Sequence, residues 1–226
     1  PYLTPVTQFD GVQSLDSFSE YMSFNTVSDY QNWLKRLQAI PKLISQITNL
    51  MREGMKRDVM PPKITLSRVP AQIQKQLVSQ ADQSLFFSQF SNYPKNFSLN
   101  DKQELTEKAL RTIQNDLIPA YQAFYDFFTS EYLPACRDSV GLSDLPQGKS
   151  YYQHLINYHT TTLLTPDEIH NIGLKEVARN KAEMDKVIQE VKFKGSFDEF
   201  LTFLRTDPQF YYQTPEALLE AYQAIS

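Results

Sequence analysis

Four side chains that combine a ring with a hydrogen-bonding atom lie close together in the sequence: Tyr151, Tyr152, Tyr158 and His159. Phenol hydroxyls and an imidazole can orient a peptide by hydrogen bonds while their rings contact its side chains. The same residue types also form ordinary aromatic cores whose polar tips reach solvent. The pattern therefore leaves two alternatives, a substrate cleft or simple packing, and we take these four residues as cleft candidates.

The three histidines do not have the spacing of a zinc-binding helix. Zinc ligands on one helical face lie three or four residues apart, usually beside a glutamate. His154 and His159 are five residues apart, so their side chains diverge by about 140° on an ideal helix. No HExxH motif occurs in the sequence, and His170 stands alone. We therefore expect no metal ligand in this chain and no zinc bound by the chain itself.

Other catalytic patterns are equally incomplete. Gly148-Lys149-Ser150 resembles the end of a phosphate-binding loop, but Ser143 occupies the position of its first glycine and no strand is predicted before it. A turn that leads into a helix is the expected structure. Cys136 has no neighbouring histidine to lower its pKa, so we expect a half-buried, unreactive thiol. The sequence predicts no catalytic residue.

Composition excludes several classes of protein. The 226 residues carry a net charge of −4 with acidic and basic residues interspersed, so no basic stripe indicates nucleic acid as a partner. No apolar run reaches the roughly 18 to 20 residues that cross a bilayer, so no transmembrane segment is expected. Hydrophobic residues make up 41% and aromatic residues 13%, enough for a core rich in rings.

Helical spacing occurs almost throughout, and strand-like alternation is nearly absent. We predict an all-α fold: an irregular multi-helix bundle, with an irregular lead over residues 1–27 and a helical domain over residues 28–226. The longest helix is expected at residues 100–132, with a kink at Pro119 and an end at Pro134. Its apolar stripe follows a spacing of three and four: Leu105, Ala109, Ile113, Leu117, Tyr121, Phe124, Phe128 and Tyr132.

The elements before the long helix are less regular. A short helix is predicted near residues 16–24, and Ser28 with Gln31 forms a capping box for the next helix. Pro41 then opens a second helix, which favours an antiparallel pair, although one nearly continuous, kinked helix is also possible. Residues 64–66 are the only plausible strand.

The C-terminal part carries strong helix signals. Thr165, Pro166 and Glu168 form a capping box with proline at the first helical position, and this helix is expected to run to about Lys194. Ser196 with Glu199 and the Thr214-Pro215-Glu216 sequence begin two further helices. No residue closes the last helix before Ser226, so we expect either a frayed end or a longer protein.

Several short motifs together resemble a bacterial family listed as domain of unknown function 885. They are Gly141-Leu142, Leu145-Pro146-x-Gly148, Tyr151-Tyr152, Thr160-Thr161, Thr165-Pro166-x-Glu168-Ile169-His170-x-Ile172-Gly173-Leu174, Gly195-Ser196, Asp207-Pro208 and Thr214-Pro215-Glu216, with Trp33-Leu34 and Tyr132-Leu133-Pro134 upstream.

This resemblance implies the N-terminal half of a helical, zincin-like metallopeptidase. Members of the family are longer, and their HExxH helix and additional glutamate ligand lie in the C-terminal half. The zinc and the peptide substrate would therefore belong to the full-length protein. This chain would form one wall of the substrate channel, against the missing C-terminal half. A periplasmic or cell-envelope location is implied, with the cytoplasm as the alternative. The competing hypothesis is a non-catalytic helical domain that binds other proteins.

Overall fold

The chain is all-α in a computed structural model that describes residues 2–225, and no β-strand occurs among them. The fold class predicted from the sequence is confirmed. The residues group into two compact units, Pro1–Tyr152 (unit 1) and Gln153–Ser226 (unit 2), and each is described by itself.

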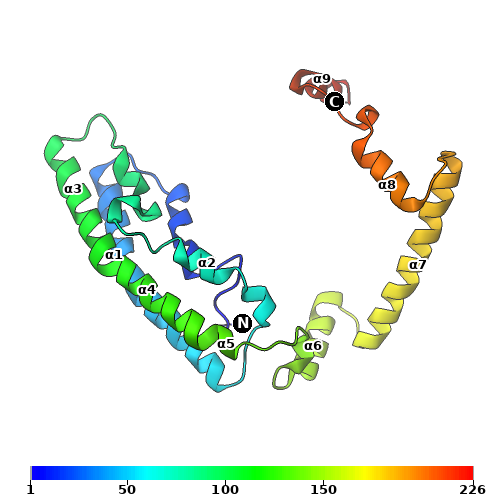
Figure 1. Cartoon of the computed structure of the whole chain (residues 1–226), viewed down its shortest axis with the longest axis horizontal. Coiled ribbons are helices and arrows are strands. Elements are labelled where there is room, and N and C mark those ends of the chain that lie inside the picture. The colour runs from blue at the N-terminus through cyan, green and yellow to red at the C-terminus, as the bar shows by residue number, and fades with distance from the viewer. Residues whose placement is uncertain (1, 226) are drawn as a thin grey trace. The chain divides into compact units, whose positions relative to one another are not determined.

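Two long helical segments lie side by side in unit 1 (Figure 1). The first is α1 (Val27–Lys56). The second is a continuous helical run composed of α3 (Leu99–Thr112), η5 (Ile113–Leu117), α4 (Ile118–Phe127), η6 (Phe128–Tyr132) and α5 (Leu133–Ala135).

The two segments run parallel. Near their starts, the rings of Tyr30 and Phe97 lie 5.4 Å apart. Near their ends, Arg52 Nη2 lies 2.8 Å from Glu131 Oε1. The antiparallel pair of helices predicted to meet at Pro41 is also wrong, because α1 continues through Pro41, and the alternative of one nearly continuous helix is correct. The helix tolerates the hydrogen bond that Pro41 removes because its neighbours, including Leu37 and Ile44, are buried in the core.

Parallel helices need a long connection, and residues 57–98 provide it with short helical pieces. These are η2 (Lys63–Leu66), α2 (Val69–Gln74), η3 (Ala81–Gln83) and η4 (Leu85–Ser91). The predicted strand at residues 64–66 is wrong, because η2 is a single 3₁₀ turn. Thr65 Oγ1 donates to the Pro62 carbonyl over 2.7 Å and closes that turn locally.

The long helix places its whole apolar stripe in the core, as predicted. Each residue of that stripe is at most 3% exposed. Two π-helical turns, η5 and η6, directly precede Ile118-Pro119 and Leu133-Pro134. A wider turn of this kind accommodates a residue that lacks a backbone N–H, so the interruption predicted at Pro119 takes the form of a π turn.

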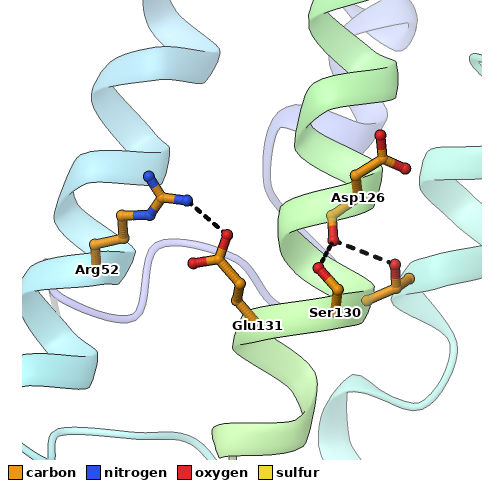
Figure 2. A network of polar contacts seen from close by, with 5 residues as sticks. Arg52, Asp126, Ser130 and Glu131 are labelled. Carbon is orange, nitrogen blue, oxygen red and sulfur yellow. Dashed lines mark hydrogen bonds and ion pairs between the residues drawn. The ribbon is translucent and has the colours of Figure 1, made fainter.

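Two hydroxyl groups of the second π turn donate to carbonyls four residues earlier in the helix. Thr129 Oγ1 donates to the Tyr125 carbonyl over 2.8 Å. Ser130 Oγ donates to the Asp126 carbonyl over 2.5 Å, as Figure 2 shows. The Arg52–Glu131 ion pair joins this turn to α1, as Figure 2 shows. Both charged side chains are about half exposed, so the pair contributes at most about 1 kcal/mol.

The N-terminal segment completes unit 1. It forms η1 (Val12–Tyr21), a 3₁₀ helix that begins earlier than the predicted short helix, and Val6 and Val12 join the core. The capping box of α1 consists of Thr26 and Asp29. The predicted Ser28–Gln31 box is therefore wrong by two residues, because the Asp29 carboxylate accepts from the Thr26 N–H at 2.8 Å.

Unit 2 contains α7 (Pro166–Glu190), α8 (Phe197–Thr206), η8 (Pro208–Phe210) and α9 (Pro215–Ile225); α6 (Gly148–Thr160) begins in unit 1 and continues into it. The capping boxes Thr165–Glu168 and Ser196–Glu199 form as predicted.

The predicted end of α7 near Lys194 is wrong by four residues. The helix ends at Glu190, and Lys192 has a positive φ of 56°. The Phe193 ring then packs on Phe200 of α8, 5.1 Å between centroids, so a tertiary contact ends the helix before Gly195 is reached.

Candidate functional site

One cavity of unit 1 measures about 600 Å³, a size typical of small-molecule sites. Its walls come from Thr4, from residues 59–62 after α1, from Arg137 after α5, and from the stretch that leads into α6. Apolar side chains form most of these walls. The lining residues are Thr4, Val59, Met60, Pro61, Pro62, Arg137, Leu142, Leu145, Pro146, Gln147, Ser150 and Tyr151.

Arg137 holds two walls of the cavity together. Its Nε donates to the Met60 carbonyl over 3.0 Å, and its Nη1 donates to the Gly141 carbonyl over 2.7 Å. Its own carbonyl accepts from the Lys63 N–H over 2.8 Å. The Nη2 group makes no hydrogen bond to any atom of residues 2–225, so one edge of the guanidinium is free to bind a carbonyl or carboxylate oxygen.

A compact turn shapes the opposite wall. Residues 142–144 form a 3₁₀ turn, η7 (Leu142–Asp144), and the Gly148 N–H donates to the Leu145 carbonyl over 2.7 Å. A Cβ atom at Gly148 would lie 2.2 Å from the Leu142 carbonyl oxygen, so only glycine permits this approach. The turn is therefore fixed by backbone contacts and gives the cavity a preformed wall.

The structure places the four cleft candidates differently. Tyr151 lines the cavity, is 40% exposed, and its hydroxyl has no hydrogen-bond partner among the described residues. Tyr152 is 43% exposed but does not line the cavity. Tyr158 and His159 lie in unit 2, where their rings pack edge to face 5.0 Å apart. All four side chains are exposed, and both alternatives, a substrate cleft and aromatic packing with polar tips in solvent, stay open.

Sequence reasoning missed Arg137 and residues 59–62. Arg137 contacts Met60 across 77 positions of the chain. No local pattern marks such a pair, because the contact arises only when α1 and the long helix end beside one another.

The other residues considered from the sequence carry no chemistry that the structure supports. Cys136 is buried, its Sγ contacts the Tyr132 carbonyl, and burial raises the pKa of the thiol to about 11. A protonated thiol is a poor nucleophile, as expected. Gly148 begins α6, as predicted for a turn that leads into a helix.

Zinc does not fit the described residues. No group of three or more His, Cys, Asp or Glu side chains within residues 2–225 could hold a metal ion. The three histidines are exposed.

Unit 2 has a shallow apolar groove of about 370 Å³ between α7 and α8. Met184 and Val187 of α7 face Phe197, Phe200 and Leu201 of α8 there. Several large apolar side chains of unit 2 are exposed, among them Val177, Met184, Val187, Val191, Leu204, Phe210, Tyr211, Leu218 and Leu219.

Comparisons with known proteins agree with the family resemblance. The model of a family described as "Bacterial protein of unknown function (DUF885)" matches residues 2–226. No curated protein matches the chain. A crystal structure from Colwellia psychrerythraea, described as a "putative lipoprotein", is similar over 95% of this chain at 24% identity with a TM-score of 0.73. That match spans 36% of the Colwellia chain, so the present sequence is about a third of its length.

Proposed function

The chain belongs to the bacterial DUF885 family, and we propose that it forms the N-terminal helical portion of a zinc-dependent peptidase. In this proposal the chain builds one wall of the substrate channel and is not catalytic by itself.

The observation that carries the proposal is the uncovered apolar surface of unit 2. Val177, Met184 and Val187 share one face of α7 and are 68%, 49% and 49% exposed. Contiguous apolar surface of this kind marks an interface. The Colwellia structure is nearly three times as long as the region matched here, so a larger protein offers polypeptide that can cover such a face.

The cavity of unit 1 supplies the second support. A peptide presents alternating carbonyl oxygens, N–H groups and side chains. The free edge of Arg137 and the Tyr151 hydroxyl can bind peptide oxygens, and the surrounding proline, leucine and valine side chains can hold an apolar side chain. The roles proposed for this chain are to bind and orient the peptide and to exclude water from it.

The zinc and the residues that hold it are proposed to lie in the remainder of the full-length protein. A cell-envelope or periplasmic location is proposed as well, supported by the description of the Colwellia protein as a "putative lipoprotein"; the cytoplasm is the alternative. No helix of the described residues is long and apolar enough to span a membrane.

The test uses full-length protein. Metal analysis should find about one zinc per chain, and a library of short peptides should be cleaved. Tyr151→Ala should raise KM severalfold with an unchanged melting temperature. Tyr21→Ala, an 85% exposed tyrosine of η1 outside the cavity, is the matched control and should leave KM unchanged. Stoichiometric zinc without cleavage of any peptide would contradict the proposal.

A non-catalytic interaction domain is the second candidate, because the apolar face of α7 would equally suit a separate protein partner. Full-length protein without zinc and without peptidase activity would favour this candidate.

A further inference from the structure

A second cavity of unit 1, about 240 Å³ in volume, lies among η1, α2 and η4. It is distinct from the cavity that Tyr151 lines and shares no lining residue with it. Its lining includes four glutamines and one carboxylate, among them the side chains of Gln13, Gln72, Gln76 and Asp16.

The local structure explains why these four side chains meet. Gln13 and Asp16 lie on either side of a kink at Ser14 in η1, and both residues line the cavity. Gln72 and Gln76 are four residues apart, on α2 and the turn that follows it, and share a face there. A hydrogen bond joins η1 to the turn after α2, because Gln76 Nε2 donates to Asp16 Oδ1 over 2.8 Å.

All three amide oxygens lack a partner. The Oε1 atoms of Gln13, Gln72 and Gln76 are buried and accept no hydrogen bond from any atom of residues 2–225. The Gln13 and Gln76 side chains are more than nine-tenths buried, each with 4% exposure. The only other buried side-chain atom without a partner in the described part of the chain is the Tyr132 hydroxyl. The three glutamines that carry these unpaired oxygens all line this one cavity.

The amide nitrogens fix the orientation of these oxygens. Gln13 Nε2 donates to the Thr7 carbonyl over 2.7 Å, and Gln72 Nε2 donates to the Gln8 carbonyl over 2.9 Å. Gln76 Nε2 also donates to the Gln13 carbonyl over 3.0 Å. Rotating any amide by half a turn would break these bonds and set its oxygen against another acceptor.

Gly11 allows the Gln13 side-chain oxygen to lie close to the backbone. Its φ of 146° is available to glycine, and a Cβ atom there would lie 2.4 Å from Gln13 Oε1. The backbone therefore makes room for an oxygen that has no protein donor.

Buried acceptors without donors are unfavourable, and such groups usually contact water or an ion. Three amide oxygens beside a carboxylate are the ligand types of a hard cation. We propose that this cavity binds a calcium ion through the amide oxygens of Gln13, Gln72 and Gln76 and the carboxylate of Asp16, with water completing the coordination.

Calcium suits this set better than magnesium does. Ca²⁺ accepts amide carbonyls in irregular geometry with six to eight ligands, whereas Mg²⁺ requires a near-ideal octahedron and keeps its water. A single carboxylate and the exposed ammonium of Lys75 at the rim set a weak affinity. We expect a Kd of about 10⁻⁴ to 10⁻³ M, as in weak oxygen-ligand sites.

The test is a calcium titration of the whole chain at constant ionic strength, with magnesium as the comparison ion. Calcium at about ten times Kd should raise the melting temperature of unit 1 by about 3 °C. In ¹⁵N-resolved NMR spectra, the side-chain amide signals of Gln13, Gln72 and Gln76 should shift together along one saturable curve. Magnesium at the same concentration should shift them little.

Two variants locate the site. Asp16→Asn keeps the acceptor for Gln76 Nε2 but removes the charge, and should weaken calcium binding about tenfold or more. Asp10→Asn, a carboxylate of the same segment outside the cavity, is the matched control and should leave the titration unchanged.

Two results would overturn the proposal. An unchanged calcium curve in Asp16→Asn would place binding elsewhere on the surface. Glutamine amide signals that stay fixed at saturating calcium would mean that the cavity holds water only.

Discussion

The two units of this chain use the same helix signals but are stabilised differently. Unit 1 buries a continuous aromatic core in which Trp33, Tyr121 and Phe124 are each at most 2% exposed. Among the described residues of unit 2, only Ile156 and Ile188 are buried apolar side chains. Capping boxes begin helices in both units, so caps determine where a helix starts but do not supply the apolar area that fixes its position.

The largest expected contrast comes from one aromatic truncation in each unit. Phe124→Ala in unit 1 should cost about 3 to 5 kcal/mol, because it leaves a cavity in a closely packed core. Phe203→Ala in unit 2 should cost less than about 1 kcal/mol, since this ring is only partly buried, 5.3 Å from Phe193 and 5.3 Å from Phe210.

Chemical denaturation measures both effects. Trp33 is the single tryptophan and lies in unit 1, so its fluorescence reports that unit alone, while far-UV circular dichroism reports both. Equal losses for the two variants would contradict the contrast.

One glycine-to-alanine substitution in each unit also distinguishes the units, with smaller expected changes in the free energy of unfolding. Gly148→Ala should destabilise unit 1 by about 1 to 3 kcal/mol, because the new methyl group would overlap the Leu142 carbonyl. Gly173→Ala in α7 has no atom within 4 Å of the new methyl group and should stabilise that helix by about 1 kcal/mol. Thermal melts followed by circular dichroism decide this; a stabilising Gly148→Ala would show that the wall of the cavity is not rigid.

Removing one helix cap in each unit should change the helicity of the two units differently. Thr26→Ala and Thr165→Ala each remove a side-chain acceptor for an N-terminal N–H, worth about 1 kcal/mol. In α1 the core should hold the helix, so helicity at room temperature should stay constant. In α7 helicity should fall, because little tertiary packing compensates. Equal helicity in the two variants would contradict this.

The smallest expected effect is a pH dependence. Hydrogen bonds from the Thr165 backbone and then its side chain lower the pKa of the Glu168 carboxyl, and Ser196 lowers the pKa of Glu199 in the same way. A lowered folded-state pKa contributes stability above the unfolded value and loses it as pH falls through the folded value. Helicity of unit 2 should therefore decrease as pH falls below about 4.5, and Glu168→Gln should flatten that decrease. An unchanged acid titration in that variant would exclude this cap as the cause.

The sequence predicted what local interactions determine. The stripe from Leu105 to Tyr132 follows one helical face, and the Thr165 and Ser196 boxes depend on residues three apart, so all were readable. The parallel course of α1 and the long helix could not be predicted from the sequence, because it depends on how residues 57–98 connect the two. Pro41 wrongly indicated the start of a new helix, because buried residues on both sides of it keep α1 continuous.

The candidate site was predicted only in part. Tyr151, one of the four cleft candidates chosen by residue type, lines the cavity, and the turn that leads into α6 was predicted at Gly148-Lys149-Ser150. Arg137 and the glutamine-lined cavity depend on pairs such as Arg137–Met60 and Gln76–Asp16, 77 and 60 positions apart. Such pairs leave no spacing that a sequence displays.

Amide hydrogen exchange on the intact chain tests most directly whether unit 1 carries its own core while unit 2 relies on local helix formation. The account predicts that amides of residues 105–132 exchange only through global unfolding, at least about a hundredfold more slowly than those of residues 166–225, which open locally. Similar protection across both regions would contradict it.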